Sequence, residues 1–417
     1  MSADRRGFLK WGLLGGLSAA TRPAGAQETA AAPAVPALDD DAAPAWMRKP
    51  GAPILSPPYG QPSPFEAGVV RKARRRPPFA TAASSGTPLQ SLHGIITPSG
   101  LHFERHHAGV PAIDPEKHRL MIHGLVERPL IFTLGELMRF PSVSRLHFIE
   151  CSGNTPWTGG QESWTAQDTH GLLSCSEWTG VPLATLLAET GLRPQARWLL
   201  AEGADAAAMS RSVPLDKALD DALVAYAQNG ERLRPEQGYP LRLVLPGFEG
   251  NMNIKWLRRI KVGDQPFQTR EETSRYTDLL PDGRARQFTF QMAAKSVITR
   301  PSGGQSLPAP GFYEISGLAW SGHGKVRRVE VSTDGGVRWR EAALQTPVLA
   351  KCLTRFRAPW TWDGGPAVLQ SRVTDETGYV QPSREALIAE VGLNSGYHCN
   401  AIHSWRVAAG GAVTNAV

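Results

Sequence analysis

The spacing of apolar residues separates an N-terminal stretch from two regions with different periodicities. Residues 27–87 are rich in Ala and Pro and follow neither helical nor strand periodicity, which predicts an extended arm rather than a domain. In residues 88–288, apolar runs of strand length, such as 120–123 and 242–245, alternate with helical patterns such as 183–190. Short strands mixed with short helices predict an α+β domain.

A period of two dominates from residue 289 to residue 417. Apolar and polar residues alternate in 313–317 and again in 328–332. The turn Asp334-Gly335-Gly336 then separates the second run from Val337-Arg338-Trp339, which is typical of a β-hairpin. The pattern predicts an all-β domain, an immunoglobulin-like sandwich.

Residues 1–26 have the pattern of a signal peptide. The pair Arg5-Arg6 precedes an apolar run at 11–20 and the small-residue site Ala24-Gly25-Ala26. Paired arginines in this position resemble a twin-arginine signal, so we expect export of the folded protein to the periplasm. The apolar run is too short to span a membrane, so the mature form is expected to have no span, and a single membrane anchor is the alternative.

The composition indicates a globular, mildly basic protein. With 417 residues the chain is long enough for about two or three domains. A content of 41% hydrophobic and 20% charged residues is ordinary for a packed core. Part of the net charge of +7 comes from the run 71–76, which has no interleaved aromatic residues. Nucleic acid is therefore a poor interpretation. A solvated arm is the simpler one, with a docking surface for an acidic partner protein as the alternative.

One cysteine stands at the end of a predicted strand. The run 146–150 leads directly to Cys151, which opens the turn Ser152-Gly153-Asn154. No CxxC motif accompanies it, so a structural zinc site is excluded. The thiol can be a nucleophile, the only protein ligand of a metal held mostly by another group, or a buried residue acting as a small hydrophobe. The other cysteines, far apart in sequence, do not suggest a disulfide framework, although one bridge could form in an oxidising compartment: Cys175, Cys352 and Cys399.

Several motifs around Cys151 resemble one enzyme family. In chain order they lie at 103–107 (FERHH), 150–154 (ECSGN), 201–205, 225–247, 253–257 (NIKWL) and 318–336. Together they are similar to the sulfite oxidase family of molybdenum enzymes, over about residues 90–410. Within that family the segment 92–111 is particularly similar to the catalytic subunit of the Sox sulfane or sulfite dehydrogenases. The resemblance implies a molybdopterin-binding domain of the sulfite oxidase fold at 88–288 and a sandwich domain at 289–417 that pairs two subunits.

The resemblance also implies a molybdenum-molybdopterin cofactor and its binding residues. In the family the metal is held by a pterin dithiolene, oxo groups and one cysteine, a soft ligand that suits a redox metal. Cys151 matches that cysteine. The matching cofactor-binding positions are Phe103, Arg105, His106, His107, Cys151, Asp205, Gln237, Arg242, Asn253 and Lys255. The residues themselves favour a ligand role for Arg242, because an unpaired charge in an apolar strand would be costly. Around Asp205 the local sequence differs from the family pattern.

The same comparison predicts catalytic residues. Arg105 is the best candidate for an anion-binding group, since guanidinium groups fit oxyanions with paired hydrogen bonds. Tyr276 falls where the family has an active-site tyrosine. Trp164 aligns loosely with a pocket tryptophan, with ordinary packing as the alternative. Arg406 aligns loosely with an arginine that reaches the pocket from the second domain.

Departures from the family pattern bear on the substrate. Thr155 and Pro156 follow the cysteine motif where sulfite oxidases have arginines, Gln237 replaces a histidine, and Met252 replaces an arginine. Fewer fixed positive charges suggest a pocket less devoted to a small free dianion. This agrees with the sulfane dehydrogenase resemblance, in which the substrate group is carried on a cysteine of a carrier protein.

Electron transfer and assembly follow from the same reasoning. No CxxCH motif occurs, so we expect no covalent haem on this chain and infer a separate c-type cytochrome subunit. The expected assembly is a homodimer or heterotetramer, with His323 and the run 71–76 as candidate docking elements. The alternatives are a sulfite:cytochrome c oxidoreductase or sulfoxide reductase on the same scaffold, and a metal-free periplasmic binding module. A cysteine hydrolase would need a base such as His147 or His170.

Overall fold

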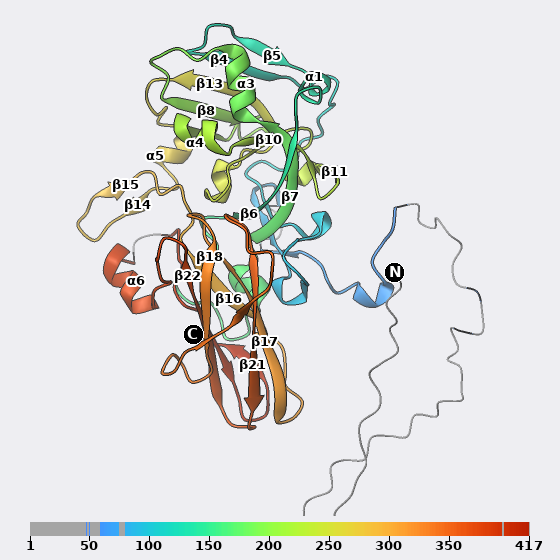
Figure 1. The fold of residues 1–417 in the computed structure, drawn as a ribbon, viewed down its shortest axis with the longest axis vertical. Coiled ribbons are helices and arrows are strands. Elements are labelled where there is room, and N and C mark those ends of the chain that lie inside the picture. The colour runs from blue at the N-terminus through green and yellow to red at the C-terminus, as the bar shows by residue number, and fades with distance from the viewer. Residues whose placement is uncertain (1–46, 48–49, 51–58, 75–79, 394–395, 417) are drawn as a thin grey trace, which may run out of the picture. The chain divides into compact units, whose positions relative to one another are not determined.

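The computed structural model describes residues 47, 50, 59–74, 80–393 and 396–416 (Figure 1). The predicted signal peptide and most of the predicted arm lie outside the described residues. The chain divides into two compact units, Met1–Ser63 and Pro64–Val417, and the fold described below is that of the second. Within the described part, every helix is too short or too polar to cross a membrane.

The last part of the predicted arm forms a small sheet. Strand β1 (Lys72–Ala73) pairs with β2 (Ser84–Gly86), and β2 pairs with β3 (Glu104–Arg105), all antiparallel. The 3-10 turns η2 (Pro64–Glu66), η3 (Ala80–Ala82), η4 (Leu89–Ser91) and η5 (Ser99–Leu101) lie along this segment. These strands are short and largely polar, so they lack the apolar alternation by which a strand is predicted.

Two five-stranded sheets build the α+β domain. One has the order β11-β10-β7-β6, with β12 also paired to β10. The other has the order β5-β4-β13-β8-β9. Their bounds are β4 Leu120–Gly124, β5 Leu130–Phe132, β6 Val143–Glu150, β7 Leu173–Pro182, β8 Trp198–Gly203, β9 Ser210–Pro214, β10 Leu223–Gln228, β11 Glu231–Arg232, β12 Arg242–Val244 and β13 Leu257–Gly263. The apolar runs at 120–123 and 242–245 are thus strands, as their pattern predicted.

Short helices connect these strands. Capping boxes begin α1 at Thr133 and α2 at Thr165. Each threonine hydroxyl accepts a hydrogen bond from the backbone N–H three residues on, and the acidic side chain at that position accepts one from the threonine backbone N–H. The helix predicted at 183–190 is present. The helices are α1 Leu134–Leu137, α2 Ala166–His170, α3 Leu183–Thr190, α4 Leu215–Asp220, α5 Arg270–Thr273 and, in the second domain, α6 Arg384–Val391. The turns η6 (Pro235–Gln237) and η7 (Gly250–Met252) lie beside β12.

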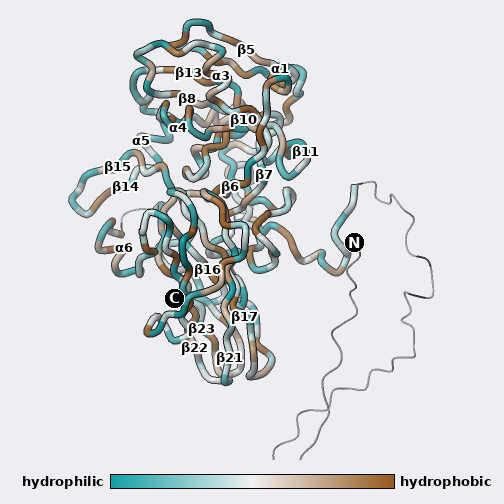
Figure 2. Tube along the Cα trace, viewed as in Figure 1, coloured by the Kyte–Doolittle hydropathy of each residue, from teal (hydrophilic) through white to brown (hydrophobic). Residues whose placement is uncertain are grey.

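Two further sheets form the β domain. One has the order β16-β17-β21-β20 and the other β19-β18-β22-β23-β24. Their bounds are β16 Lys295–Arg300, β17 Gly311–Trp320, β18 Val326–Ser332, β19 Arg340–Glu341, β20 Ala343–Leu344, β21 Thr354–Trp362, β22 Ala367–Asp375, β23 Ser404–Val407 and β24 Val413–Asn415. The short hairpin β14 (Asp278–Leu279) and β15 (Ala285–Arg286) precedes them. Hydrophobic and hydrophilic segments are intermixed along these strands (Figure 2). The predicted hairpin exists, but its second strand is β19, after Val337-Arg338-Trp339.

The core of the β domain extends into the α+β domain. Phe148 on β6 and Leu173 and Cys175 on β7 belong to the same buried cluster as Trp320 and Trp405 of the sandwich. The sulfur atoms of Cys175 and Cys352 lie 3.4 Å apart, as two free thiols from different domains. The β6–β7 pair is therefore shared by both domains. A separate apolar cluster fills the interior of the α+β domain around β4, β8 and β13.

Candidate active site

One cavity collects all the residues predicted to bind the cofactor. It is lined by Phe103, Arg105, His106, His107, Cys151, Asp205, Met209, Gln237, Arg242, Gly250, Asn251, Asn253, Ile254, Lys255, Trp256 and Tyr276. These side chains come from β3, the end of β6, the loop after β8, η6, β12 and the segment before β13. Segments far apart in the sequence thus converge on one place.

A second, larger cavity adjoins the first. Its volume is about 970 Å³, and both cavities are lined by Arg105, His107, Cys151 and Tyr276. Only the larger one is lined by Arg74, Arg270, Arg275 and Tyr397. We call the smaller one the cofactor cavity and the larger one the outer cavity. Cys151 lies where they meet.

The position of Cys151 is fixed by the strand that precedes it. Strand β6 ends at Glu150, and the Cys151 amide donates to the Leu172 carbonyl at 3.0 Å. A Cβ on Gly250 would stand 2.9 Å from the Glu150 carbonyl oxygen and 3.2 Å from the Cys151 Cα, so a larger residue here would force the backbone of the cysteine turn to shift. Burial raises the pKa of the Cys151 thiol, against the opposing effects of the Gly153 amide and the Arg105 and Arg74 charges. A bound metal ion would reverse this and hold the thiolate form.

The hydrolase interpretation finds no support in this geometry. A nucleophilic cysteine requires a lowered pKa and a base within hydrogen-bond reach. The His147 ring instead lies 3.3 Å from the Lys351 carbonyl, and the His170 ring 2.9 Å from the Thr169 hydroxyl. Neither imidazole lines a cavity with Cys151.

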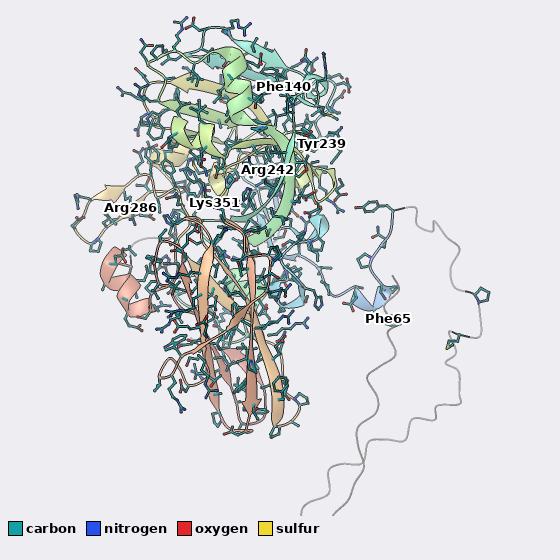
Figure 3. All side chains as sticks on the ribbon, in the orientation of Figure 1. Phe65, Phe140, Tyr239, Arg242, Arg286 and Lys351 are labelled. Atoms are coloured by element: carbon teal, nitrogen blue, oxygen red, sulfur yellow. The ribbon has the colours of Figure 1, made fainter. Side chains whose placement is uncertain are left out.

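Two buried cations give the cofactor cavity its charge. Arg242 is 4% exposed, and its Nη1 donates to the Gln237 carbonyl and side chain at 3.2 and 3.1 Å. The Lys255 ammonium lies 2.8 Å from His106 Nδ1 and donates to the Arg105 and Glu236 carbonyls at 3.1 and 3.2 Å. Burial lowers the pKa of Arg242 to about 9 and also lowers that of Lys255. Arg242 is labelled in Figure 3.

These cations have no acidic partner among the described residues. Among the described residues, the side chains of Arg242 and Lys255 make hydrogen bonds only to carbonyl oxygens, an amide and an imidazole, and the Arg242 Nε has no acceptor there. Leaving such charges buried and unpaired is costly. Asp205 Oδ1 is likewise buried there without a donor. The cavity therefore has free donors and a free acceptor for an anionic ligand with polar ring atoms, and a pterin with a phosphate and a dithiolene fits this set.

Tyr276 and His107 face the boundary between the cavities. The Tyr276 hydroxyl lies 3.5 Å from His107 Nε2, and its ring lies 5.1 Å from that of Tyr397. Burial raises the pKa of Tyr276 well above its usual range, so the hydroxyl stays protonated and can donate. Burial and the Arg105 charge lower the pKa of His107 to about 4, so its ring is neutral at pH 7.

Two predicted catalytic residues lie elsewhere. Arg406 is on β23, where Trp405 and Val407 face the core, so its side chain points outward, 54% exposed and 3.9 Å from Glu162. Trp164 packs against Gly160 and lines neither cavity. The structure therefore brings neither Trp164 nor Arg406 to the two cavities. The second domain instead contributes Tyr397, which no sequence motif marked.

A buried ion pair joins the cysteine segment to the β domain. The Glu150 carboxylate accepts from Lys295 Nζ at 2.6 Å, from Trp320 Nε1 at 2.6 Å and from Asn154 Nδ2 at 3.0 Å. Glu150 is fully buried and Lys295 is 1% exposed. The residues on both sides of the Cys151 turn are thus held by strands of the second domain.

Comparisons with known proteins agree with this site. Residues 107–271 match the model of the oxidoreductase molybdopterin binding domain, and residues 286–405 match the Mo-co oxidoreductase dimerisation domain. Sulfite oxidase from Gallus gallus is 31% identical over 321 residues, covering 71% of this chain and 68% of that protein. Nitrate reductase [NADH] from Solanum lycopersicum is 32% identical over 350 residues, covering 72% of this chain but 38% of that protein. The chain thus spans little more than a third of the plant enzymes it matches.

A solved structure matches nearly the whole chain. The crystal structure of the sulfane dehydrogenase SoxCD from Paracoccus pantotrophus has a TM-score of 0.88 and 47% identity, over 91% of this chain and 98% of that one. The predicted fold class, a molybdopterin-binding α+β domain followed by a β-sandwich domain, is confirmed.

Proposed function

Because the chain belongs to the sulfite oxidase family of molybdopterin oxidoreductases, we propose that it oxidises reduced sulfur, carried as a sulfane or sulfite group, with a molybdenum-molybdopterin cofactor. The observation that carries this proposal is the pair of buried cations, Arg242 and Lys255, which lack an acidic partner in the cavity that ends at Cys151. Such a site needs an anionic ligand, and the cysteine beside it is the ligand type that a redox metal prefers.

Each group in the cofactor cavity has a distinct role in this proposal. The bound cofactor would supply a two-electron oxidation at the metal. Cys151 would hold the metal, Arg242 and Lys255 would neutralise the anionic parts of the pterin, and Asp205 Oδ1 would be available to accept a hydrogen bond from its ring. The Tyr276 hydroxyl stays protonated and would donate a hydrogen bond to the oxygen that reacts with the sulfur group.

The size of the outer cavity favours a sulfur group attached to a larger carrier. At about 970 Å³ it matches the volume of sites that hold drug-sized ligands, which is far more than a small oxyanion needs. The sulfane dehydrogenase named in the solved structure supports the same substrate class. The second candidate is a direct sulfite:cytochrome c oxidoreductase, which the sulfite oxidase relatives support. Rapid oxidation of free sulfite, with no turnover of a carrier peptide bearing a cysteine persulfide, would favour that candidate.

Partners and location complete the proposal. Electrons leave singly to a c-type cytochrome subunit, and the dimerisation domain supports a homodimer or heterotetramer. The twin-arginine pattern supports export to the periplasm. Purification of the periplasmic form, with N-terminal sequencing and identification of co-purifying haem protein, tests these points together. A protein that retains Met1 and carries no haem partner would contradict them.

The cofactor itself is tested by metal analysis. We expect stoichiometric molybdenum in the purified protein by elemental mass spectrometry, and its loss in Cys151→Ser. Cys399→Ser is the matched control, because Cys399 is a buried thiol that lines neither cavity. Protein without molybdenum, from a host that makes the pterin, would refute the enzyme and favour a metal-free binding module.

A further inference from the structure

The small sheet of the N-terminal arm places two arginines in one row. Ser84 on β2 pairs with Arg105 on β3, and on its other side its carbonyl accepts from the Arg74 amide at 2.8 Å. Residues opposite one another in an antiparallel sheet point to the same face. Arg74, Ser84 and Arg105 accordingly all line the outer cavity. The run 71–76 was assigned to a solvated arm from its composition alone, yet one of its side chains, Arg74, lines the outer cavity.

The Arg74 guanidinium is oriented but not neutralised. Its Nη2 donates to the Gln167 and Asp168 carbonyls at 3.2 and 3.0 Å, at the end of α2. The Asp168 carboxylate pairs instead with Lys72, at 2.7 Å. No carboxylate of the described residues lies within ion-pair distance of Arg74. Its remaining N–H groups have no acceptor among the described residues, and their forked geometry suits an oxyanion.

The rest of the outer cavity has the same sign. Arg270 and Arg275 line it with Arg74 and Arg105, and Glu271, the single acid in its lining, accepts from Arg270 at 2.6 Å. Thr155 and Pro156, which follow the cysteine turn, contribute no charge. The positive charge beside Cys151 therefore comes from other segments, and one of them is the arm.

We propose that Arg74 is a substrate-binding residue that holds the oxyanion of the sulfur group next to Cys151. This inference rests on the proposed function and specifies its substrate class as a sulfur group that carries or acquires negatively charged oxygen. Arg74 and Arg105, side by side across β2, form a clamp for that group, and Arg270 and Arg275 draw it into the outer cavity.

Sulfate binding to the holoenzyme tests the inference without turnover. Titration with sulfate, followed by thermal shift, should give about tenfold weaker binding for Arg74→Gln, as expected when one charge-assisted contact is lost. Arg74→Lys keeps the positive charge but lacks the forked guanidinium, so its sulfate affinity should lie between those of the unmodified enzyme and Arg74→Gln. Lys72→Gln is the matched control, because Lys72 lies two residues before Arg74 but its side chain is 60% exposed and lines neither cavity. It should bind sulfate like the unmodified enzyme.

Turnover of a short peptide bearing a cysteine persulfide gives the second measurement. KM should rise about tenfold in Arg74→Gln, with kcat within about twofold, because substrate binding and not the cofactor is affected. Sulfate affinity and KM equal to those of Lys72→Gln would refute the inference, as would a lower melting temperature with unchanged sulfate affinity. If Arg74→Gln does not fold, Arg74→Lys decides by the same criteria. If the unmodified enzyme does not turn over the persulfide peptide, the proposed function is contradicted. The sulfate titration would still decide whether Arg74 binds an oxyanion.

Discussion

Removing Lys295 should destabilise the protein because it leaves the buried Glu150 carboxylate without its counter-ion. The Lys295 ammonium is the only cation that contacts the Glu150 carboxylate among the described residues, and both side chains are almost fully buried. In Lys295→Met the carboxylate keeps its bonds from Trp320 and Asn154 but loses its counter-ion. Breaking such a pair from one side typically costs about 3–5 kcal/mol, and the two remaining donors place this site near about 3 kcal/mol.

A double variant distinguishes the cost of an unpaired charge from the loss of the ion pair itself. When Glu150→Gln is added to Lys295→Met, no charge remains unpaired, so part of the lost stability should return. The recovery stays partial because the new amide nitrogen faces a donor, Trp320 Nε1 or Asn154 Nδ2. The matched control is Arg357→Met, which removes a surface pair with Glu314 whose side chains are 44% and 47% exposed. An exposed pair contributes less than about 1 kcal/mol.

Melting temperature by calorimetry is the assay. The unit Pro64–Val417 has 354 residues (417 − 64 + 1). At about 2.1 cal/mol/K of unfolding entropy per residue, about 3 kcal/mol corresponds to a fall of about 4 °C in Lys295→Met. The control should stay within about 2 °C of the unmodified protein. The reasoning would be refuted if Lys295→Met melted like the control, or if the double variant were less stable than Lys295→Met.

Three further predictions concern the site and its pH dependence. Arg242→Met should retain less than about a tenth of the pterin, measured by fluorescence after extraction, because a charge-assisted contact is lost, whereas Arg406→Met should retain it all. Tyr276→Phe should keep its molybdenum but lose about a hundredfold in kcat, since one donor at the reacting oxygen is removed, and an unchanged kcat would exclude that role. Burial lowers the pKa of His102 to about 3 and that of His403 to about 4. The unfolded chain therefore binds more protons than the folded one below about pH 6.5, so denaturant titrations should show stability falling from there to about pH 4. A flat profile over that range would contradict the burial of these rings as neutral groups.

The residues that the family motifs predicted to bind the cofactor all line the cofactor cavity, because they lie in recognisable segments of the sequence. Arg242 could even be singled out by physics, as a charge inside an apolar strand, and the structure places it 4% exposed. Gln237, a departure from the family pattern, still lines the cavity and accepts a hydrogen bond from Arg242. The pattern of apolar runs likewise located β4 and α3.

Residues that depend on backbone pairing could not be predicted. Arg74 reaches the outer cavity through the register of β1, β2 and β3, which are too short and too polar to produce a periodic signal. Arg406 does not line either cavity, and the loose alignment could not decide this, because a shift of one residue moves a side chain to the other face of a strand. Tyr397 lies in a loop whose sequence has no periodicity, and the contact of its ring with that of Tyr276 depends on the approach of the two domains.

The shared β6–β7 pair means that the two domains are not separable parts. A fragment ending near residue 288 would expose Phe148, Leu173 and Cys175 to water and would leave Glu150 without its cation. Exchanging the sandwich for that of a relative would alter the support of the cysteine turn as well as the assembly surface. Any change to the packing of the sandwich domain in this protein therefore also changes the residues that support the Cys151 turn.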